Sequence, residues 1–235
     1  MTVTHIGTSG WSYPEWKGGF YPEDMKADGM LPYYAQRFDG VEVNNTFYRL
    51  PKREVLQGWG EQVPAGFSFA IKASQRITHK AKLGPEAADA VAYLIEACGA
   101  LGDGLGPILF QTPPWLKKDA PLLRGFLALL PAKTLASFEF RNTTWFEEEI
   151  YDALRERNAA LVVADTGEEG KDPPLVATAD WGYARLRRVE YPGTLLDDWA
   201  ARLRAMDWER LWVFFKHEDE GTGPRLAARF QELMR

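Results

Sequence analysis

The run Phe67-Ser68-Phe69-Ala70-Ile71-Lys72 alternates bulky apolar side chains with small ones and ends on a lysine. Because successive side chains of a strand point to opposite faces, we expect the bulky set to face covering helices and the small set to face the axis of a barrel. Leu135–Arg141 has the same alternation and also ends on a cation. Both runs predict parallel strands that are buried on both faces and deliver charged groups at their C-terminal ends.

Similar β-rich runs occur along the whole chain. Their ends are spaced by roughly 20–40 residues, about the length of a strand and its following helix in a (β/α)8 barrel. The stretch Thr166–Ala179 is an exception, because it contains Gly and Pro and has weak helical character. The sequence therefore predicts an α/β protein, a single TIM-like (β/α)8 barrel over residues 1–235 with an irregular sixth βα unit. The eight predicted strands are Val3–Thr8, Gly40–Asn44, Phe67–Lys72, Pro107–Gln111, Leu135–Arg141, Leu161–Asp165, Tyr183–Arg187 and Leu211–Lys216.

Composition narrows the class of protein. The net charge is −5 and no long run of Lys and Arg occurs, which argues against a broad nucleic-acid footprint but allows a local basic pocket. The single cysteine, Cys98, excludes an intrachain disulfide framework. No apolar run approaches the roughly 18 residues of a membrane span, and no signal peptide is evident. We expect a cytoplasmic protein with no membrane partner, and the sequence leaves its oligomeric state open.

Ionisable groups gather at the predicted C-terminal strand ends, where barrel enzymes build their sites. An unpaired buried charge is costly, so these groups must pair with one another, reach water or meet a ligand. A self-contained network of ion pairs is therefore the structural alternative to a functional site. We expect the catalytic groups to be Glu42, Glu139, Asp165 and Lys72. We expect the substrate-binding residues to be Ser9, Trp11, Tyr13, Asn44, Tyr48, His79, Gln111, Arg141, Trp145, Arg185, Arg187 and Lys216.

A series of short motifs covers nearly the whole chain: Gly7-Thr8-Ser9-Gly10-Trp11, Glu42-Val43-Asn44-Asn45-Thr46-Phe47-Tyr48, Phe69-Ala70-Ile71-Lys72-Ala73, Phe110-Gln111-Thr112-Pro113-Pro114 and Glu139-Phe140-Arg141-Asn142. In combination they resemble domain-of-unknown-function family 72 (DUF72), the YecE-like proteins. The resemblance implies a single TIM-like barrel, in a family that has been likened to sugar isomerases. It implies a fold rather than a particular reaction.

Two positions depart from the pattern of this family. The family often has Arg-x-His-Gly after its seventh strand, where this chain has Arg185-Leu186-Arg187-Arg188. It often ends its eighth strand in Phe-Asn-Asn, where this chain has Phe215-Lys216-His217. Both changes add positive charge at the mouth of the predicted barrel. We therefore expect a ligand that is more anionic than the family's usual one, or different from it.

The mixture of cations and carboxylates favours chemistry on a small anionic molecule. Arg offers planar paired donors, and Lys a point charge, to a carboxylate or phosphate. A carboxylate kept ionised by nearby cations suits a general base, and a cation can polarise a carbonyl group. The leading hypothesis is an isomerase- or lyase-like enzyme that acts on a polar, anionic, carbohydrate-like molecule, with Glu139 as the candidate base.

Two other functions stay open from the sequence. A carboxylate pair could hydrolyse a glycosidic bond, and the three acids could hold a divalent metal. A non-catalytic module could bind a nucleotide or RNA through the same cations and aromatic rings. No cofactor and no metal site are predicted, because the chain has neither paired cysteines nor a His-Glu-x-x-His motif. Among the histidines we expect only His79 at the site, with His5 at the barrel floor and His217 pointing away from it.

Overall fold

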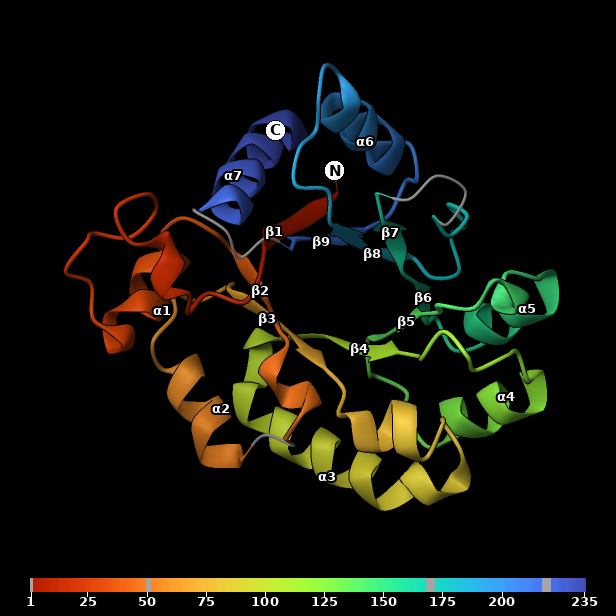
Figure 1. Cartoon of the computed structure of the whole chain (residues 1–235). Coiled ribbons are helices and arrows are strands. Elements are labelled where there is room, and N and C mark those ends of the chain that lie inside the picture. Colours follow the sequence, from red (N-terminus) through yellow and green to blue (C-terminus); the bar gives the residue numbers. More distant parts are fainter. Residues whose placement is uncertain (1, 50–51, 168–171, 217–220) are drawn as a thin grey trace.

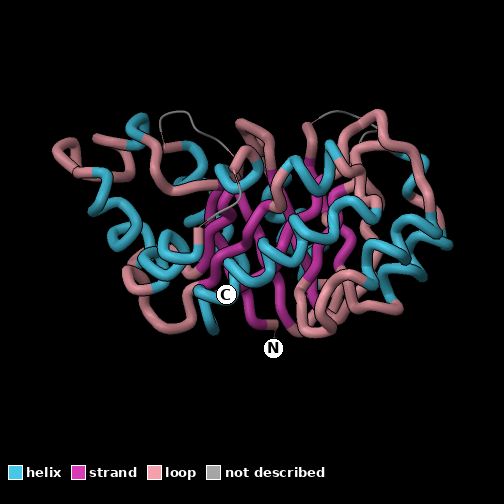
Figure 2. The backbone as a smooth tube through the Cα atoms, turned by 90° about the horizontal axis from the view of Figure 1, so that it is seen from below, coloured by secondary structure: helices cyan, strands magenta, loops and turns pink. Residues whose placement is uncertain are grey.

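The computed structural model describes residues 2–49, 52–167, 172–216 and 221–235, and within them a ring of helices surrounds a central sheet (Figure 1). Viewed from the side, the strands run inside a layer of helices (Figure 2). The strands are β1 Val3–Ser9, β2 Gly40–Val43, β3 Ser68–Lys72, β4 Leu105–Gln111, β5 Ala136–Glu139, β6 Ala160–Leu161, β7 Val163–Asp165, β8 Trp181–Leu186 and β9 Arg210–Phe215. The α-helices are α1 Ala27–Ala35, α2 Arg53–Gly60, α3 Ala88–Cys98, α4 Ala120–Ala128, α5 Glu148–Arg155, α6 Leu195–Arg204 and α7 Thr222–Met234.

The sheet is parallel throughout, and it is nearly closed into a barrel. Its strand order is β6-β5-β4-β3-β2-β1-β9-β8-β7. The two strands at the ends of this order, β6 and β7, are separated in the sequence only by Val162, whose N–H donates to the carbonyl oxygen of Phe138 at 2.9 Å. The nine short strands are therefore eight barrel strands, the sixth of which is interrupted at Val162. This arrangement confirms the predicted TIM-like α/β barrel.

The sixth βα unit is irregular, as the sequence predicts. The described residues between β7 and β8, 166–167 and 172–180, contain no helix. Among the α-helices, α4 begins at a clear local signal. At the start of α4 the Asp119 carboxylate accepts a hydrogen bond from the N–H of Leu122 at 2.9 Å, and Pro121 occupies the first turn.

Among the described residues, no helix combines the length and the apolar character needed to cross a bilayer.

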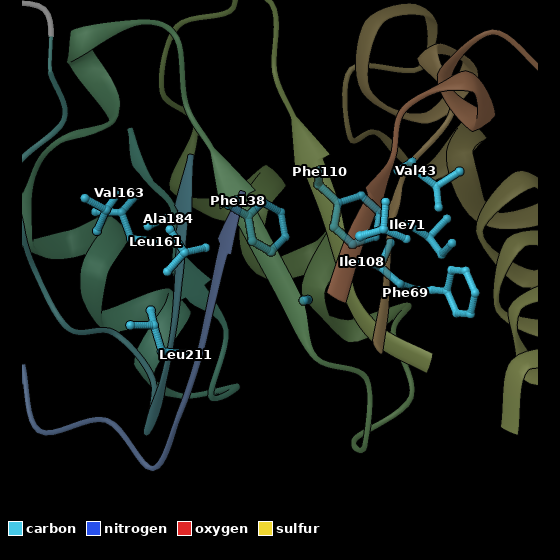
Figure 3. Packing of buried hydrophobic residues seen from close by; sticks show 14 of the residues in the cluster. Val43, Phe69, Ile71, Ile108, Phe110, Phe138, Leu161, Val163, Ala184 and Leu211 are labelled. Atoms are coloured by element: carbon cyan, nitrogen blue, oxygen red, sulfur yellow. The ribbon is translucent and has the colours of Figure 1, made fainter. Parts of the chain in front are cut away.

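The alternation along the strands sorts the core into two layers. Side chains such as Phe69, Ile71 and Phe138 pack between the sheet and the helices (Figure 3). The opposite face of the strands fills the barrel interior with a smaller cluster: Ala70, Leu109, Ala160, Val162, Trp181, Tyr183, Trp212 and Phe214. The indole N–H of Trp212 donates to the Ser68 hydroxyl at 2.9 Å, so the one polar group of that ring is satisfied inside the barrel. Apolar side chains thus fill the barrel below the polar ends of its strands.

Close packing at the start of β8 gives a test of this architecture. A Cβ added at Gly182 would lie 2.2 Å from Cε3 of the buried Trp208 ring. We expect Gly182→Ala to lower the free energy of unfolding by about 1–3 kcal/mol, because the ring and the strand would have to move apart. Urea unfolding followed by circular dichroism measures the change. Gly125→Ala in α4 is the control, because nothing lies within 4 Å of its added Cβ, and it should be neutral or stabilising. Equal stability of the two variants would contradict the packing described for Trp208.

Candidate active site

A cavity of about 410 Å³ lies at the C-terminal ends of the strands. The lining follows from the alternation of side chains along the strands. The lining residues are inward-pointing residues at the C-terminal ends of strands, or residues in the loops that follow. Most of the residues predicted from the sequence are brought together there: Ser9, Tyr13, Asn44, Tyr48, Lys72, His79, Gln111, Arg141, Arg185, Arg187 and Lys216. Asn45 and Phe47 also line the cavity and were not predicted. Both belong to the turn that directly follows β2, and their place in the quoted motif around Asn44 was the available signal.

Arg185 is at the centre of the charged groups below the cavity. Its side chain is only 2% exposed. Nη2 lies 2.8 Å from Oε1 of Glu42, and Nη1 lies 2.5 Å from Oε2 of Glu139. The two carboxylates come from β2 and β5, so one guanidinium joins three strands of the barrel. Such a buried, doubly paired arginine fixes the positions of all three groups.

Neutral donors occupy the remaining hydrogen-bonding positions on the carboxylate oxygens of Glu42. The Ser9 hydroxyl donates to Oε1 at 2.7 Å, the Asn44 amide to Oε1 at 2.9 Å, and the Tyr183 hydroxyl to Oε2 at 2.7 Å. Tyr183 was not predicted as a site residue, although it points to the same face as Arg185, two residues later in β8. Burial raises the pKa of Glu42, but Arg185 and these hydrogen bonds outweigh it and lower the pKa to about 2. This carboxylate is therefore ionised at neutral pH and fully engaged.

Glu139 is held mainly by cations. The Gln111 amide donates to Oε2 at 2.9 Å, Arg187 forms an ion pair with Oε1, and Nε of Arg141 lies 3.4 Å from the same oxygen. Burial opposes ionisation, yet Arg185, Arg187 and Arg141 together hold the pKa of Glu139 well below its usual value. Like Glu42, it lies beneath the cavity and is not among the residues that line it.

Lys72 and His79 differ from these anchored groups. Within the described residues, the Lys72 amine forms no hydrogen bond or ion pair, and it lies 4.6 Å from the centre of the Phe47 ring. Burial, and then the charge of Arg185, lower the pKa of Lys72 to about 8. His79 lies on the turn Arg76–Lys80, with Nδ1 2.8 Å from the Thr78 hydroxyl. Burial and the neighbouring cations Lys72 and Arg141 lower the pKa of His79.

Some buried polar atoms near the cavity lack a partner. In the described part of the chain, Nε of Arg185, Nε of Arg187 and Oδ1 of Asn44 are buried and form no hydrogen bond. A buried donor or acceptor without a partner costs free energy, so water or a bound molecule that satisfies these atoms would be favoured. All three residues line the cavity.

Asp165, which was expected among the catalytic groups at the mouth of the barrel, does not point into the barrel. Its carboxylate accepts hydrogen bonds from Nε of Arg188 at 2.7 Å and from the indole N–H of Trp199 in α6 at 3.1 Å. The reason is the alternation itself: Asp165 shares a face with Leu161 and Val163, which pack in the outer core. Asp165 therefore anchors α6 and the strand end, and Arg188, which the sequence analysis did not single out, is its partner.

Two predicted aromatic residues also lie outside the main cavity. Trp145 is fully buried, stacks on Phe140 with ring centres 4.4 Å apart, and donates its indole N–H to the carbonyl oxygen of Leu116 at 2.7 Å. Trp11 packs edge-on against Trp59 and lines a smaller cavity of about 200 Å³, which shares Tyr13, Asn44 and Asn45 with the central cavity. Trp145 is therefore a packing residue, whereas Trp11 lies beside the central cavity. His217 lies outside the described residues.

The described residues contain no cluster of three or more His, Cys, Asp or Glu side chains that could hold a metal ion. Glu42 and Glu139 are both bonded to Arg185, and Asp165 is directed elsewhere. The arrangement of the acids thus suits the fixing of an arginine better than the coordination of a divalent ion.

The fold and the cavity together define a TIM-like barrel protein with a cationic mouth. A family model described as "Protein of unknown function DUF72" matches residues 5–235, and the chain belongs to this family. The resemblance predicted from the motifs is thereby confirmed.

Curated relatives and solved structures agree with this assignment. The chain is 30% identical over 170 residues to UPF0759 protein YecE of Escherichia coli strain K12, a match covering 70% of this chain and 60% of that protein. It is 26% identical over 158 residues to UPF0759 protein YunF of Bacillus subtilis strain 168, covering 64% of this chain and 55% of that protein. The matches thus span little more than half the length of these relatives. A crystal structure of a DUF72 family protein from Thermotoga maritima shares the fold, with a TM-score of 0.86, 24% identity and 99% coverage of both chains.

Removing the central cation tests the network beneath the cavity. We expect Arg185→Met to lower the free energy of unfolding by about 3–5 kcal/mol at about pH 7, because two buried carboxylates lose their partner. The loss should shrink toward about pH 3.5. The low pKa of Glu42, about 2, gives the folded wild type stability that is complete above the ordinary pKa of 4.5 and is lost progressively as the pH falls from there toward 2. Urea titrations at both pH values measure it.

The control for this variant is Arg124→Met, which breaks the exposed ion pair with Glu156. It should change the free energy of unfolding by no more than about 0.5 kcal/mol at either pH. A loss in Arg185→Met that does not depend on pH would refute the role of Arg185 as the partner that keeps both carboxylates ionised.

Proposed function

We propose that this protein is an enzyme that binds a small, polar, carbohydrate-like anion in the central cavity. The observation that carries the proposal is the charge of the lining. The basic side chains there are Lys72, Arg141, Arg185, Arg187 and Lys216, and no carboxylate is among the described lining residues. Glu42 and Glu139 lie below and are already bonded to donors. An anionic ligand would balance the excess positive charge, and a carboxylate or phosphate fits Arg and Lys donors.

Proton transfer in this proposal uses Lys72 and His79 instead of the carboxylates. A general acid or base works best when its pKa lies near the working pH. The pKa of Lys72, about 8, meets this condition. The depressed pKa values and occupied oxygens of Glu42 and Glu139 make them positioning residues for Arg185. An isomerase- or lyase-like reaction at a carbonyl group is the favoured class, since Arg141 and Arg187 can hold the anionic group while the amine and imidazole move protons.

Nucleotides are a second candidate class of ligand, and one observation favours them. Tyr48 at the rim of the cavity is 77% exposed and also lines a neighbouring surface cavity of about 550 Å³ with Arg49, Arg76 and Tyr93. An exposed aromatic ring beside cations can stack on a base while the phosphates reach the basic mouth.

The hydrolase hypothesis based on a carboxylate pair has less support, because both carboxylates are bound to one arginine.

A panel of thermal shifts tests the ligand class. Sugar phosphates and sugar acids should raise the melting temperature in a saturable way, while the matching neutral sugars should not, because a ligand that binds only the folded state stabilises it by mass action. Stabilisation by nucleotides that exceeds that by sugar phosphates would favour the second candidate. Equal effects of neutral and anionic sugars would contradict the proposed anionic site.

Arg141 gives the matching mutational test. It is partly exposed and only weakly paired with Glu139, so Arg141→Ala should leave the fold intact. We expect the dissociation constant of the best anionic ligand to rise about tenfold, the equivalent of about 1.4 kcal/mol, through loss of a charge-assisted hydrogen bond. Arg229→Ala removes a surface cation paired with Asp197 and should leave affinity unchanged. The same loss in both variants would indicate a non-specific effect of net charge.

The pH dependence of anion binding tests whether the charge of Lys72 contributes to that binding. Sulfate is a suitable probe because its charge is constant across the range. Its dissociation constant should rise about fivefold as the pH increases through 8, because the amine loses its proton and about 1 kcal/mol of attraction with it. Lys72→Arg keeps a positive charge at this position and should show a nearly flat profile. An identical pH dependence in both proteins would assign the effect to another group.

A further inference from the structure

The Lys72 amine is a reactive group that no ion pair restrains. In the described residues the arginines of the mouth, Arg141, Arg185 and Arg187, all contact Glu139, whereas Lys72 contacts no carboxylate. The centre of the Phe47 ring lies 4.6 Å from the nitrogen. The amine is therefore close to an apolar ring, in a cavity that Arg141 and Arg185 also line.

The backbone holds this lysine and its apolar neighbour in a fixed relation. The Thr46 hydroxyl lies 2.6 Å from the carbonyl oxygen of Lys72 and 3.0 Å from that of Val43, so it ties the end of β3 to the turn Asn45–Phe47. The Ser74 hydroxyl adds a contact of 3.3 Å to the carbonyl oxygen of Phe47. The backbone from which the Lys72 side chain extends is thus fixed between two neighbouring strand ends.

The surroundings favour the neutral form of the amine. Burial and Arg185 disfavour the ammonium ion most, Arg141 adds to this, and Glu42 and Glu139 oppose it from below. With a pKa of about 8, about a quarter of the amine is neutral at pH 7.5, against about 0.1% for an ordinary lysine. A neutral amine with a free lone pair is the form that attacks carbonyl groups.

We propose that Lys72 is a nucleophile that forms an imine with a small carbonyl compound carrying a carboxylate or phosphate. The inference rests on the proposed function, because it assigns the anionic group of the same ligand to Arg141 and Arg187. It narrows the substrate class to open-chain aldehydes or ketones with an anionic group a few bonds from the carbonyl carbon. An imine there would act as an electron sink for breaking a neighbouring C–H or C–C bond, as isomerase- and lyase-like reactions require.

The step balances without an oxidant or reductant. The lone pair of Nζ forms a bond to the carbonyl carbon, and the π electrons of the C=O bond move onto oxygen. Both hydrogens of the neutral amine then leave with that oxygen as one molecule of water when the C=N bond forms. The imidazole of His79, which packs edge-on against Phe47 with ring centres 5.0 Å apart, lines the same cavity and can carry these protons between nitrogen and oxygen.

Borohydride trapping tests the inference directly. The full chain is incubated with glyoxylate, glycolaldehyde phosphate or uncharged glycolaldehyde, reduced, digested and mapped by mass spectrometry. Lys72 should be labelled at least about tenfold more than Lys80 and Lys216 in the same digest, because burial and Arg185 favour the neutral, nucleophilic form of its amine. Both anionic probes should label Lys72 faster than glycolaldehyde, and sulfate should protect it. The relative rates of glyoxylate and glycolaldehyde phosphate distinguish a carboxylate from a phosphate as the preferred group.

Lys72→Arg is the matched variant, since it retains the charge but cannot form an imine. It should lose the label at this position while sulfate still stabilises it against heat. Labelling spread evenly over the lysines, with sulfate binding intact, would overturn the imine and leave the anionic site standing. Selective labelling of Lys72 by glycolaldehyde, without preference for the anionic probes and without stabilisation by sulfate, would overturn both the anionic substrate class and the proposed function.

Discussion

The structure depends on a buried arginine shared by two carboxylates. Arg185 on β8 reaches Glu42 from β2 and Glu139 from β5, and each of these groups is buried. Taking three ions out of water is costly, and only close, multiply hydrogen-bonded pairing offsets that cost. The upper part of the barrel is therefore organised around one requirement: every oxygen of the two carboxylates faces a donor. Ser9, Asn44, Tyr183, Gln111 and the further arginines meet it.

The apolar lower part of the barrel supports this network. Trp181, Tyr183, Trp212 and Phe214 fill the interior below the charged layer, and helices cover the outer face of the strands. Water is thereby kept from the underside of Arg185, which strengthens the ion pairs on which it depends. The same arrangement leaves basic side chains of the described residues facing the open cavity. This polarity supports the proposed anionic ligand, because the positive charges are fixed in place before a ligand arrives.

The two acids and the amine have different parts in this arrangement. Each oxygen of Glu42 and Glu139 accepts from a donor and the pKa values of both groups are low, so the proposed function assigns them the positioning of Arg185 and Arg187. Burial, and then the charge of Arg185, lower the pKa of Lys72 to about 8. The contrast arises from the partners of each group, since both carboxylates contact Arg185, whereas the Lys72 amine contacts no carboxylate in the described part of the chain.

The sequence by itself determined the barrel and most of the lining of its mouth, because the direction of a strand side chain is set by local backbone geometry. Alternation placed Lys72, Gln111, Arg185 and Lys216 at the cavity. It was applied wrongly to Asp165, which shares the outer face of Leu161 and Val163 and bonds to Arg188 and Trp199. Residue type alone could not tell a lining aromatic from a core one, so Trp145 was misplaced. Only the tertiary structure decided which charges are neutralised, since Glu42 and Arg185 are 143 residues apart in sequence and meet across a closed barrel. The pairing and burial of these charged groups, and the pKa values that result, depend on strands that are distant in the sequence meeting in the barrel. No local sequence pattern encodes them.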